Sequence, residues 1–104
     1  MTQTAISRAG VPIRLQDERW AHIVDEHGEL EGKQGDVLQT ISQAEHVLEG
    51  EAGEFFAVRM VQSDRALVVV YRELSAEDGF VITAFLTSQA TKLFRRTQVW
   101  PPRT

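Results

Sequence analysis

Three histidines, His22, His27 and His46, are the side chains of this sequence best suited to proton transfer near neutral pH. On a helix, the spacing of His22 and His27 places the two rings roughly 140° apart, unlike the i, i+4 pair of a helical zinc site. The chain also contains no cysteine, which excludes disulfides and thiolate metal sites. We therefore expect no metal and no cofactor, and general acid–base chemistry becomes the candidate role of a histidine.

Arginines and hydroxyls in the second half of the chain offer partners for such a histidine. Arg59 and Arg72 can hold an anion, while Thr83 and Tyr71 can position it. These residue types suit metal-independent cleavage of RNA. The 2′-hydroxyl of RNA is an internal nucleophile, so a protein needs only to move protons and stabilise charge on phosphorus. The alternative is that both arginines simply pair with neighbouring glutamates, because their spacing alone does not show that these groups converge.

The composition fits one globular domain. A chain of 104 residues has room for a single core, and 42% of its residues are apolar and 25% charged. No apolar run approaches the roughly 20 residues of a membrane span, and the start MTQTAISRAG lacks the apolar stretch of a secretory signal. We expect a cytoplasmic protein without membrane association. The net charge of −4 argues against a broad nucleic-acid-coating surface but leaves room for a local basic site.

The elements that position these groups follow from hydrophobic periodicity. Residues 1–12 are expected to form a flexible N-terminal segment, and residues 13–100 a single α+β domain. A second helix should begin near residues 34–36, after a glycine-containing loop. The first helix, over residues 17–27, is predicted by an i, i+3, i+4, i+7 stripe formed by Trp20, Ile23, Val24 and His27.

From residue 54 onward the pattern becomes typical of strands. A short strand is expected first at 46–49, and β-prone runs follow at 54–61, 65–73 and 79–87, separated by turn sequences. Residues 98–100 can add a last short strand. The predicted architecture is two N-terminal helices packed on an antiparallel sheet meander of about four strands.

Alternation along these strands predicts two different sheet faces, if the first hairpin turns on Ser63-Asp64. The face expected against the helices is almost entirely apolar and carries Phe56, Val58, Met60, Leu67, Val69, Tyr71, Phe80, Ile82, Ala84 and Leu86. The opposite face mixes cations, hydroxyls and aromatic rings, which makes it the predicted binding surface. It carries Phe55, Ala57, Arg59, Val68, Val70, Arg72, Val81, Thr83, Phe85 and Thr87.

The C-terminal segment is the most basic part of the chain. Arg95 and Arg96, with Phe94 and Trp100 nearby, could grip an RNA backbone and stack a base. The alternative is that the aromatic rings pack inward and leave the cations in water. His27 also has a structural interpretation, because a cationic histidine is favoured at a helix C-terminus by the macrodipole.

Three segments of the chain carry a family resemblance that covers residues 13–100. Arg19 to Glu29 resembles an RW-x-HI-x-x-x-H-x-E opening, and LVVVYR (67–72) and FVITAFLT (80–87) resemble later segments of the same proteins. These are small bacterial proteins of the phage-associated branch of the Barnase–EndoU–Colicin–RelE (BECR) nucleases. Gly28 stands where that family has proline after the histidine.

The resemblance implies N-terminal helices followed by an antiparallel sheet, as in RelE-like proteins, and a metal-independent ribonuclease of the toxin type. It implies that His27 is an acid–base residue, that Arg72 is the phosphate cation and that Thr83 is a hydroxyl on the following strand, with His22 as a secondary candidate.

Two functions have particular residues behind them, and a third, a small-molecule binder on the mixed sheet face, has no specific residue signature. The first is a toxin-like endoribonuclease that acts on RNA, with His27, Arg72 and Thr83 as catalytic residues. Its substrate contacts would be His22, Arg59, Tyr71, Arg95 and Arg96. The second is a non-catalytic interaction module, such as an immunity or antitoxin-like protein or a homodimer former. The acidic stretch DERWAHIVDEHGELEG and an apolar patch around Phe55 and Phe85 would serve that role.

Overall fold

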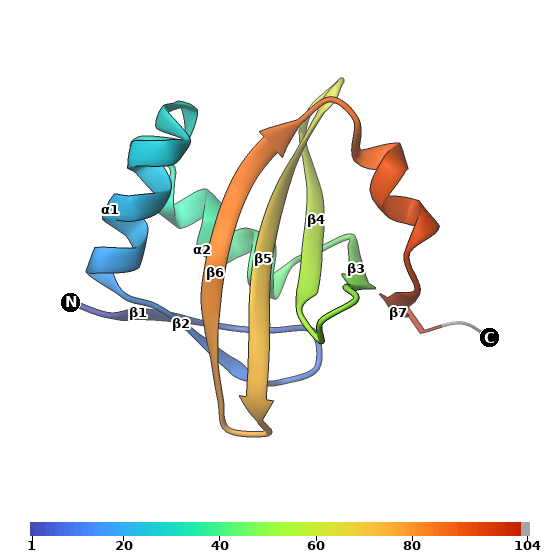
Figure 1. Ribbon diagram of the computed structural model, residues 1–104, viewed down its shortest axis with the longest axis horizontal. Coiled ribbons are helices and arrows are strands. Elements are labelled where there is room, and N and C mark those ends of the chain that lie inside the picture. Colours follow the sequence, from blue (N-terminus) through green and yellow to red (C-terminus); the bar gives the residue numbers. More distant parts are fainter. Residues whose placement is uncertain (103–104) are drawn as a thin grey trace.

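A seven-stranded sheet in the order β1-β2-β6-β5-β4-β3-β7 is the framework of the protein in the computed structural model, which describes residues 1–102 (Figure 1). The strands are β1 (Gln3–Ile6), β2 (Pro12–Leu15), β3 (His46–Glu49), β4 (Phe55–Gln62), β5 (Arg65–Ser75), β6 (Asp78–Thr87) and β7 (Gln98–Trp100). The α-helices are α1 (Asp17–Glu26) and α2 (Gln34–Ser42), and short 3₁₀ helices are η1 (Gly28–Leu30) and η2 (Ala90–Arg95).

The prediction of a roughly four-stranded antiparallel meander under two helices is wrong, although the chain is still an α+β protein. The central meander β4-β5-β6 lies where the sequence predicts it. However, β2 joins β6 in parallel, through Ile13 opposite Gly79 and Arg14 opposite Phe80. By pairing with β6, this short segment buries the side chains of Ile13 and Leu15 completely. The result is a mixed sheet.

Both flanks of the meander are extended by short strands. β1 pairs antiparallel with β2, although residues 3–6 fall within the segment that we expected to be flexible. The two strands are joined by a tight turn in which Gly10 adopts a positive φ of 88° and the Ser7 amide donates to the Val11 carbonyl over 2.8 Å. On the other flank, β3 pairs with β4 and β7.

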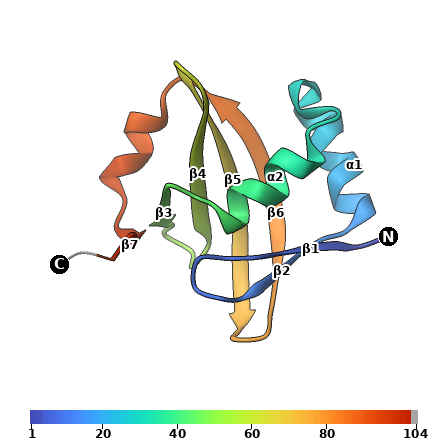
Figure 2. The same ribbon diagram turned by 180° about the vertical axis from the view of Figure 1, so that it is seen from behind.

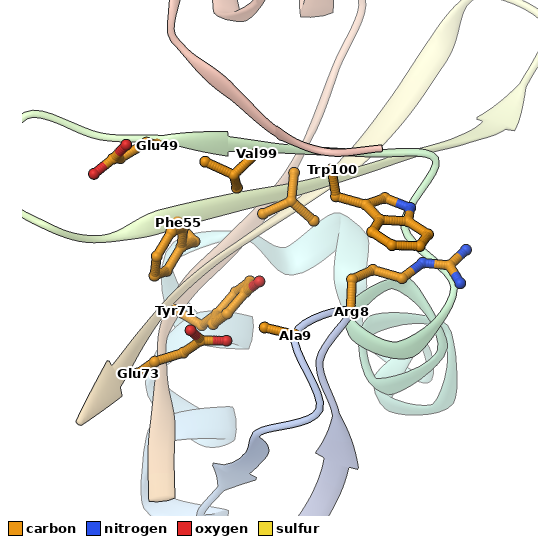
Figure 3. Close-up of a pocket in the computed structure, with 9 residues that line it drawn as sticks. Arg8, Ala9, Glu49, Phe55, Tyr71, Glu73, Val99 and Trp100 are labelled. Atoms are coloured by element: carbon orange, nitrogen blue, oxygen red, sulfur yellow. The ribbon is translucent and has the colours of Figure 1, made fainter. Parts of the chain in front are cut away.

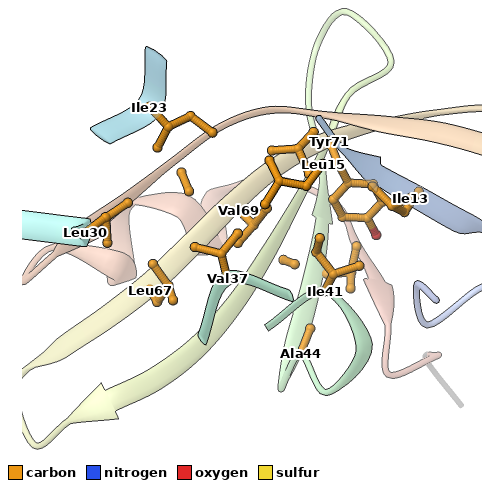
Figure 4. Close-up of a cluster of buried hydrophobic side chains, with 14 of the residues drawn as sticks. Ile13, Leu15, Ile23, Leu30, Val37, Ile41, Ala44, Leu67, Val69 and Tyr71 are labelled. Atoms are coloured by element: carbon orange, nitrogen blue, oxygen red, sulfur yellow. The ribbon is translucent and has the colours of Figure 1, made fainter. Parts of the chain in front are cut away.

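One side of the sheet is covered by α1 and α2 and holds the larger core (Figures 2 and 4). We call it the inner side. Removing these apolar side chains from water stabilises the fold at roughly 25 cal/mol per Å² of buried area. The fully buried members of this core include Ile13, Leu15, Ile23, Leu30, Val37, Ile41, Ala44, Val69 and Ala84. Within residues 1–102, neither α-helix has the length and apolarity needed to cross a bilayer.

The opposite side of the sheet, called the outer face here, is only partly covered. Its smaller core consists of Leu48, Val58, Ala66, Val68 and Val70, against which Ala90 and Leu93 of η2 pack. Figure 1 looks onto this face: α1 flanks it beyond β6, and η2 flanks it on the side of β3 and β7. The outer side chains Phe56, Arg72, Thr83 and Phe85 are half-buried.

A bulge in β4 changes the predicted assignment of its side chains. The hairpin turns on Ser63-Asp64 as expected, with Gln62 opposite Arg65, but Met60 then pairs with Ala66 instead of Leu67. One extra residue, Val61, therefore lies in β4. Because a one-residue slip moves every following side chain to the other face, Phe55, Ala57 and Arg59 lie on the inner side and Phe56 and Val58 on the outer face.

A bulge near the start of β6 also moves side chains to the face opposite to the predicted one. Val70 pairs with Thr83, whereas the next residue, Tyr71, pairs with Val81. Ile82 is therefore the extra residue, and Val81 joins the inner core while Ile82 packs on the outer one. Beyond the bulge, Thr83 and Phe85 keep their predicted place on the outer face.

Candidate functional site

Arg72 and Thr83 lie on the same side of the sheet, as the alternation along β5 and β6 predicts. A row of outer-face residues crosses the three central strands, with Val70 paired to Phe56 on one side and to Thr83 on the other. Arg72 is the next outer residue along β5 after Val70. The row therefore has an aromatic ring at its β4 end, a hydroxyl at its β6 end and a cation beside it.

One guanidinium group lies over the aromatic ring of this row, and a second lies toward the loop between β3 and β4. The guanidinium carbon of Arg96 lies 4.8 Å from the centroid of the Phe56 ring, in a cation–π arrangement. Arg72 extends toward the β3–β4 loop, where its Nη1 would lie 3.3 Å from a Cβ added to Gly53. Within residues 1–102, neither arginine forms an ion pair. Both positive charges are thus free to meet an anion.

The basic side chains continue from the outer face into a neighbouring cleft of about 470 Å³, between the β3–β4 loop and η2. Lys92, Arg95 and Arg96 line it from the C-terminal segment, and Glu49 and Glu51 line the opposite side. Arg96 belongs to both places, since its guanidinium also covers Phe56. A chain-like anion that follows the outer face would therefore find further cations at this end.

His27 stands beyond the β6 edge of the outer face. It caps the C-terminus of α1, where its backbone amide donates to the Ile23 carbonyl over 2.7 Å. The imidazole centroid is 6.2 Å from that of Phe85, an outer residue of β6, and the side chain is 32% exposed. Its Nδ1 lies 3.8 Å from a carboxylate oxygen of Glu29, too far for a hydrogen bond but within range of an electrostatic attraction when the ring is protonated. Sequence reasoning about candidate residues missed Glu29, although it lies only two positions after His27.

The imidazole and the guanidinium groups are not gathered at one point. His27 contacts β6, whereas Arg96 lies over β4 and Arg72 reaches toward the loop that precedes β4. Because neighbouring strands are about 4.8 Å apart, β6 and β4 are separated by roughly 10 Å. These groups can contact different parts of one extended ligand more readily than a single phosphate.

Arg59 does not join Arg72, contrary to the predicted site. The bulge in β4 turns Arg59 to the inner side, where its Nε donates to the Thr40 hydroxyl over 3.1 Å and its Nη2 to the Asp36 carbonyl over 3.2 Å. The Asp36 carboxylate is 3.8 Å away, and the Arg59 side chain is only 17% exposed. Arg59 therefore ties β4 to α2.

The remaining predicted contacts are also dispersed. Tyr71 lies on the inner side and is 1% exposed. The His22 ring is well exposed on α1, with its Nε2 at 2.6 Å from a Glu26 carboxylate oxygen. His46, whose role the sequence left open, has its Nδ1 at 3.0 Å from the Gln98 amide oxygen and links β3 to β7.

The apolar patch required by the interaction-module hypothesis is not formed. Phe55 packs on Tyr71 on the inner side, with a ring separation of 5.6 Å, whereas Phe85 lies on the outer face. The sheet separates the two rings, so one partner surface cannot cover both.

Among residues 1–102, no group of three His, Asp or Glu side chains is arranged to hold a metal ion. Comparisons of the chain with models of protein families, with curated proteins and with solved structures give no match.

Proposed function

We propose that the outer face binds RNA and that His27 moves the protons of a metal-independent, toxin-like cleavage of the bound strand. The observation that carries the proposal is the cluster of Arg96, Phe56 and Arg72, which shares this face with Thr83 and with the ring that His27 contacts. The resemblance of the His27 helix and of strands β5 and β6 to phage-associated nucleases supports it.

Binding rests on the alternation of cations and rings. Guanidinium groups neutralise phosphates, and exposed aromatic faces stack bases without regard to sequence. Phe85 supplies a half-buried ring, Arg96 presents its guanidinium over the Phe56 ring, and neither Arg72 nor Arg96 has an ion pair in the described part of the chain. A local basic surface of this kind is compatible with a net charge of −4, because binding depends on the charges that face the strand.

The proposed reaction uses the 2′-hydroxyl of RNA as the nucleophile. His27 takes the hydroxyl proton, a bond forms between the 2′ oxygen and phosphorus, and the bond to the 5′ oxygen breaks. The leaving 5′ oxygen takes a proton from water, and protonated His27 returns its proton to the resulting hydroxide, which leaves a cyclic phosphate on one fragment and a 5′-hydroxyl on the other. Thr83, on the strand whose Phe85 ring His27 contacts, hydrogen-bonds the phosphate, and Arg72, on the neighbouring strand, binds an adjacent phosphate of the same RNA strand.

The test is a cleavage assay with a labelled single-stranded RNA in the presence of EDTA, together with a binding measurement on the same RNA. We expect cleavage by the wild type, a loss of about 10²-fold or more in His27→Gln, and unchanged binding in that variant. Lys33→Met, which removes a positive charge at the start of α2 on the inner side, is the matched control and should leave both activities unchanged.

Two results would overturn parts of the proposal. In the first, the wild type binds RNA and Arg72→Met binds it more weakly, but the wild type cuts no RNA. This result would remove the catalytic role of His27. A folded protein that neither binds nor cuts RNA would remove the proposal entirely and favour the non-catalytic interaction module.

A further inference from the structure

A second cavity, of about 310 Å³, opens on the inner side of the sheet, away from the proposed RNA surface (Figure 3). Its walls come from the turn between β1 and β2, from β3, β4 and β5, and from β7. Three aromatic residues, Phe55, Tyr71 and Trp100, form much of the lining, and Glu73 adds a carboxylate; Glu49 lies at the rim, with its carboxylate turned away from Tyr71 (Figure 3). An apolar cavity with a few polar groups is the usual form of a small-molecule site.

The hydroxyl of Tyr71 points into this cavity (Figure 3). The residue as a whole is 1% exposed, but among residues 1–102 no buried side-chain nitrogen or oxygen atom lacks a hydrogen-bond partner, so the hydroxyl is not a sealed, unpaired group. The oxygen is open to the cavity, where a bound molecule can reach it. Burial, and to a smaller extent the charge of Glu73, raises the pKa of the Tyr71 phenol well above its ordinary value. The group therefore stays protonated and can both donate and accept.

A hydrogen bond from Ser7, in the turn between β1 and β2, holds the Glu73 side chain in place. One carboxylate oxygen accepts a hydrogen bond from the Ser7 hydroxyl over 2.7 Å, and that hydroxyl in turn accepts one from the Val11 amide over 3.2 Å. Ser7 is itself only 4% exposed. The second carboxylate oxygen of Glu73 has no hydrogen bond within the described residues, so a fixed negative charge remains available to the cavity.

The one cation of the lining is engaged elsewhere. Arg8 donates from Nε to the Ala44 carbonyl over 3.0 Å, and its guanidinium carbon lies 4.9 Å from the Trp100 ring centroid. In Figure 3 the guanidinium extends past Trp100, on the side away from Glu73. The charge nearest Tyr71 in the cavity is therefore that of Glu73.

We infer that this cavity binds a small organic ammonium ion, whose N–H groups donate to Glu73 and to the Tyr71 oxygen while its apolar body rests on the three aromatic rings. A cation gains from the Glu73 carboxylate through charge-assisted hydrogen bonds and from the ring faces through cation–π attraction. The volume of about 310 Å³ lies at the lower end of the usual range of ligand pockets, roughly 300–1,000 Å³, and suits a small molecule.

The experiment compares two ligands that differ in charge. The full chain is titrated with 2-phenylethylammonium chloride and, separately, with 2-phenylethanol, and binding is followed by calorimetry and by the NMR signal of the Trp100 indole. We expect saturable binding of the ammonium ion, at least about tenfold tighter than that of the alcohol, the factor that one charge-assisted hydrogen bond supplies. Equal affinity for both compounds, or no saturable binding by the folded protein, would overturn the inference.

Two variants locate the site. Glu73→Gln keeps the shape of the side chain and its contact with Ser7 but removes the charge, and should weaken ammonium binding about tenfold. Tyr71→Phe removes only the hydroxyl, keeps the packed ring and should weaken binding by a smaller factor. Glu77→Gln, which removes the same charge from an exposed turn, is the control and should bind like the wild type. Unchanged affinity in Glu73→Gln with a normal melting temperature would refute the assignment.

Discussion

Arg59 and Arg72 should respond in opposite ways to substitution by methionine, because they lie on opposite sides of the sheet. Arg59 donates hydrogen bonds to the Thr40 hydroxyl and the Asp36 carbonyl of α2. A hydrogen bond from a charged group contributes about 1.5–3 kcal/mol when it is protected from water. Only the bond to Thr40 is partly buried, and the exposed Asp36 carboxylate adds little.

We therefore expect Arg59→Met to lower the free energy of unfolding by about 2 kcal/mol, which for a domain near this size corresponds to roughly 8–16 °C in melting temperature. Methionine keeps the apolar stem of the side chain, so the change reports mainly the lost polar contacts. RNA binding at a temperature where the variant is folded should be unchanged. The stability measurement is thermal denaturation followed by circular dichroism.

Arg72→Met should leave the melting temperature nearly unchanged, because no ion pair holds that side chain within residues 1–102. Its effect should appear in RNA binding. For single strands, each neutralised phosphate contributes about 0.7 to the slope of log K against log salt concentration. Losing one contact thus lowers the slope by about 0.7 and the affinity about fivefold at 0.1 M salt, relative to 1 M salt.

A titration series at several salt concentrations measures both quantities. If Arg59→Met reduced the salt slope while Arg72→Met destabilised the fold, the register of β4 against β5 described above would be incorrect. If neither variant changed the slope, the outer face would not be the RNA surface.

Two further predictions concern the sheet. Gly79→Ala should destabilise the protein by about 1–3 kcal/mol, because the new Cβ would lie 2.5 Å from the Arg72 carbonyl oxygen and 2.6 Å from Ile13 Cδ1. Gly28→Ala, where a Cβ meets nothing within 4 Å, should change the melting temperature little, and equal effects of the two substitutions would contradict this packing. The second prediction is a pH dependence. Hydrogen bonds from Arg14 at 2.8 and 3.1 Å hold the pKa of Asp78 below its ordinary value. The ionised carboxylate therefore stabilises the folded state above about pH 4. This stabilisation is lost as the pH falls through the lowered pKa of Asp78. Acid denaturation should therefore be less steep in Asp78→Asn than in the wild type, and identical profiles would refute this role of Asp78.

Local signals in the sequence predict the elements of the fold better than their pairing. The stripe from Trp20 to His27 and the β-prone runs after residue 54 correspond to α1 and to β4, β5 and β6. In contrast, the bulges at Val61 and Ile82 leave no mark in an alternating pattern, because both positions hold β-branched residues that suit either face of a strand. The wrong placement of Arg59 follows directly from the first of these bulges.

The candidate sites depend still more on long-range pairing. Sequence alone places Arg72 and Thr83 on one face, because the two strands are consecutive and joined by a short turn. No local signal relates Arg96 to Phe56, or Ser7 to Glu73, since each contact needs a short strand or segment from the far end of the chain. The aromatic cavity cannot be predicted from the sequence either, because its lining residues come from segments that are far apart in the chain.

The parallel pairing of β2 with β6 has a consequence for the way the chain folds during synthesis. Ile13 finds its partner only at Gly79, and Val47 finds one of its partners only at Trp100. Such distant pairings close late, because the loop entropy must be overcome before the contact is formed. We expect the β4-β5-β6 meander to assemble first, and β2 to lack its parallel partner until β6 has been synthesised and has left the ribosome.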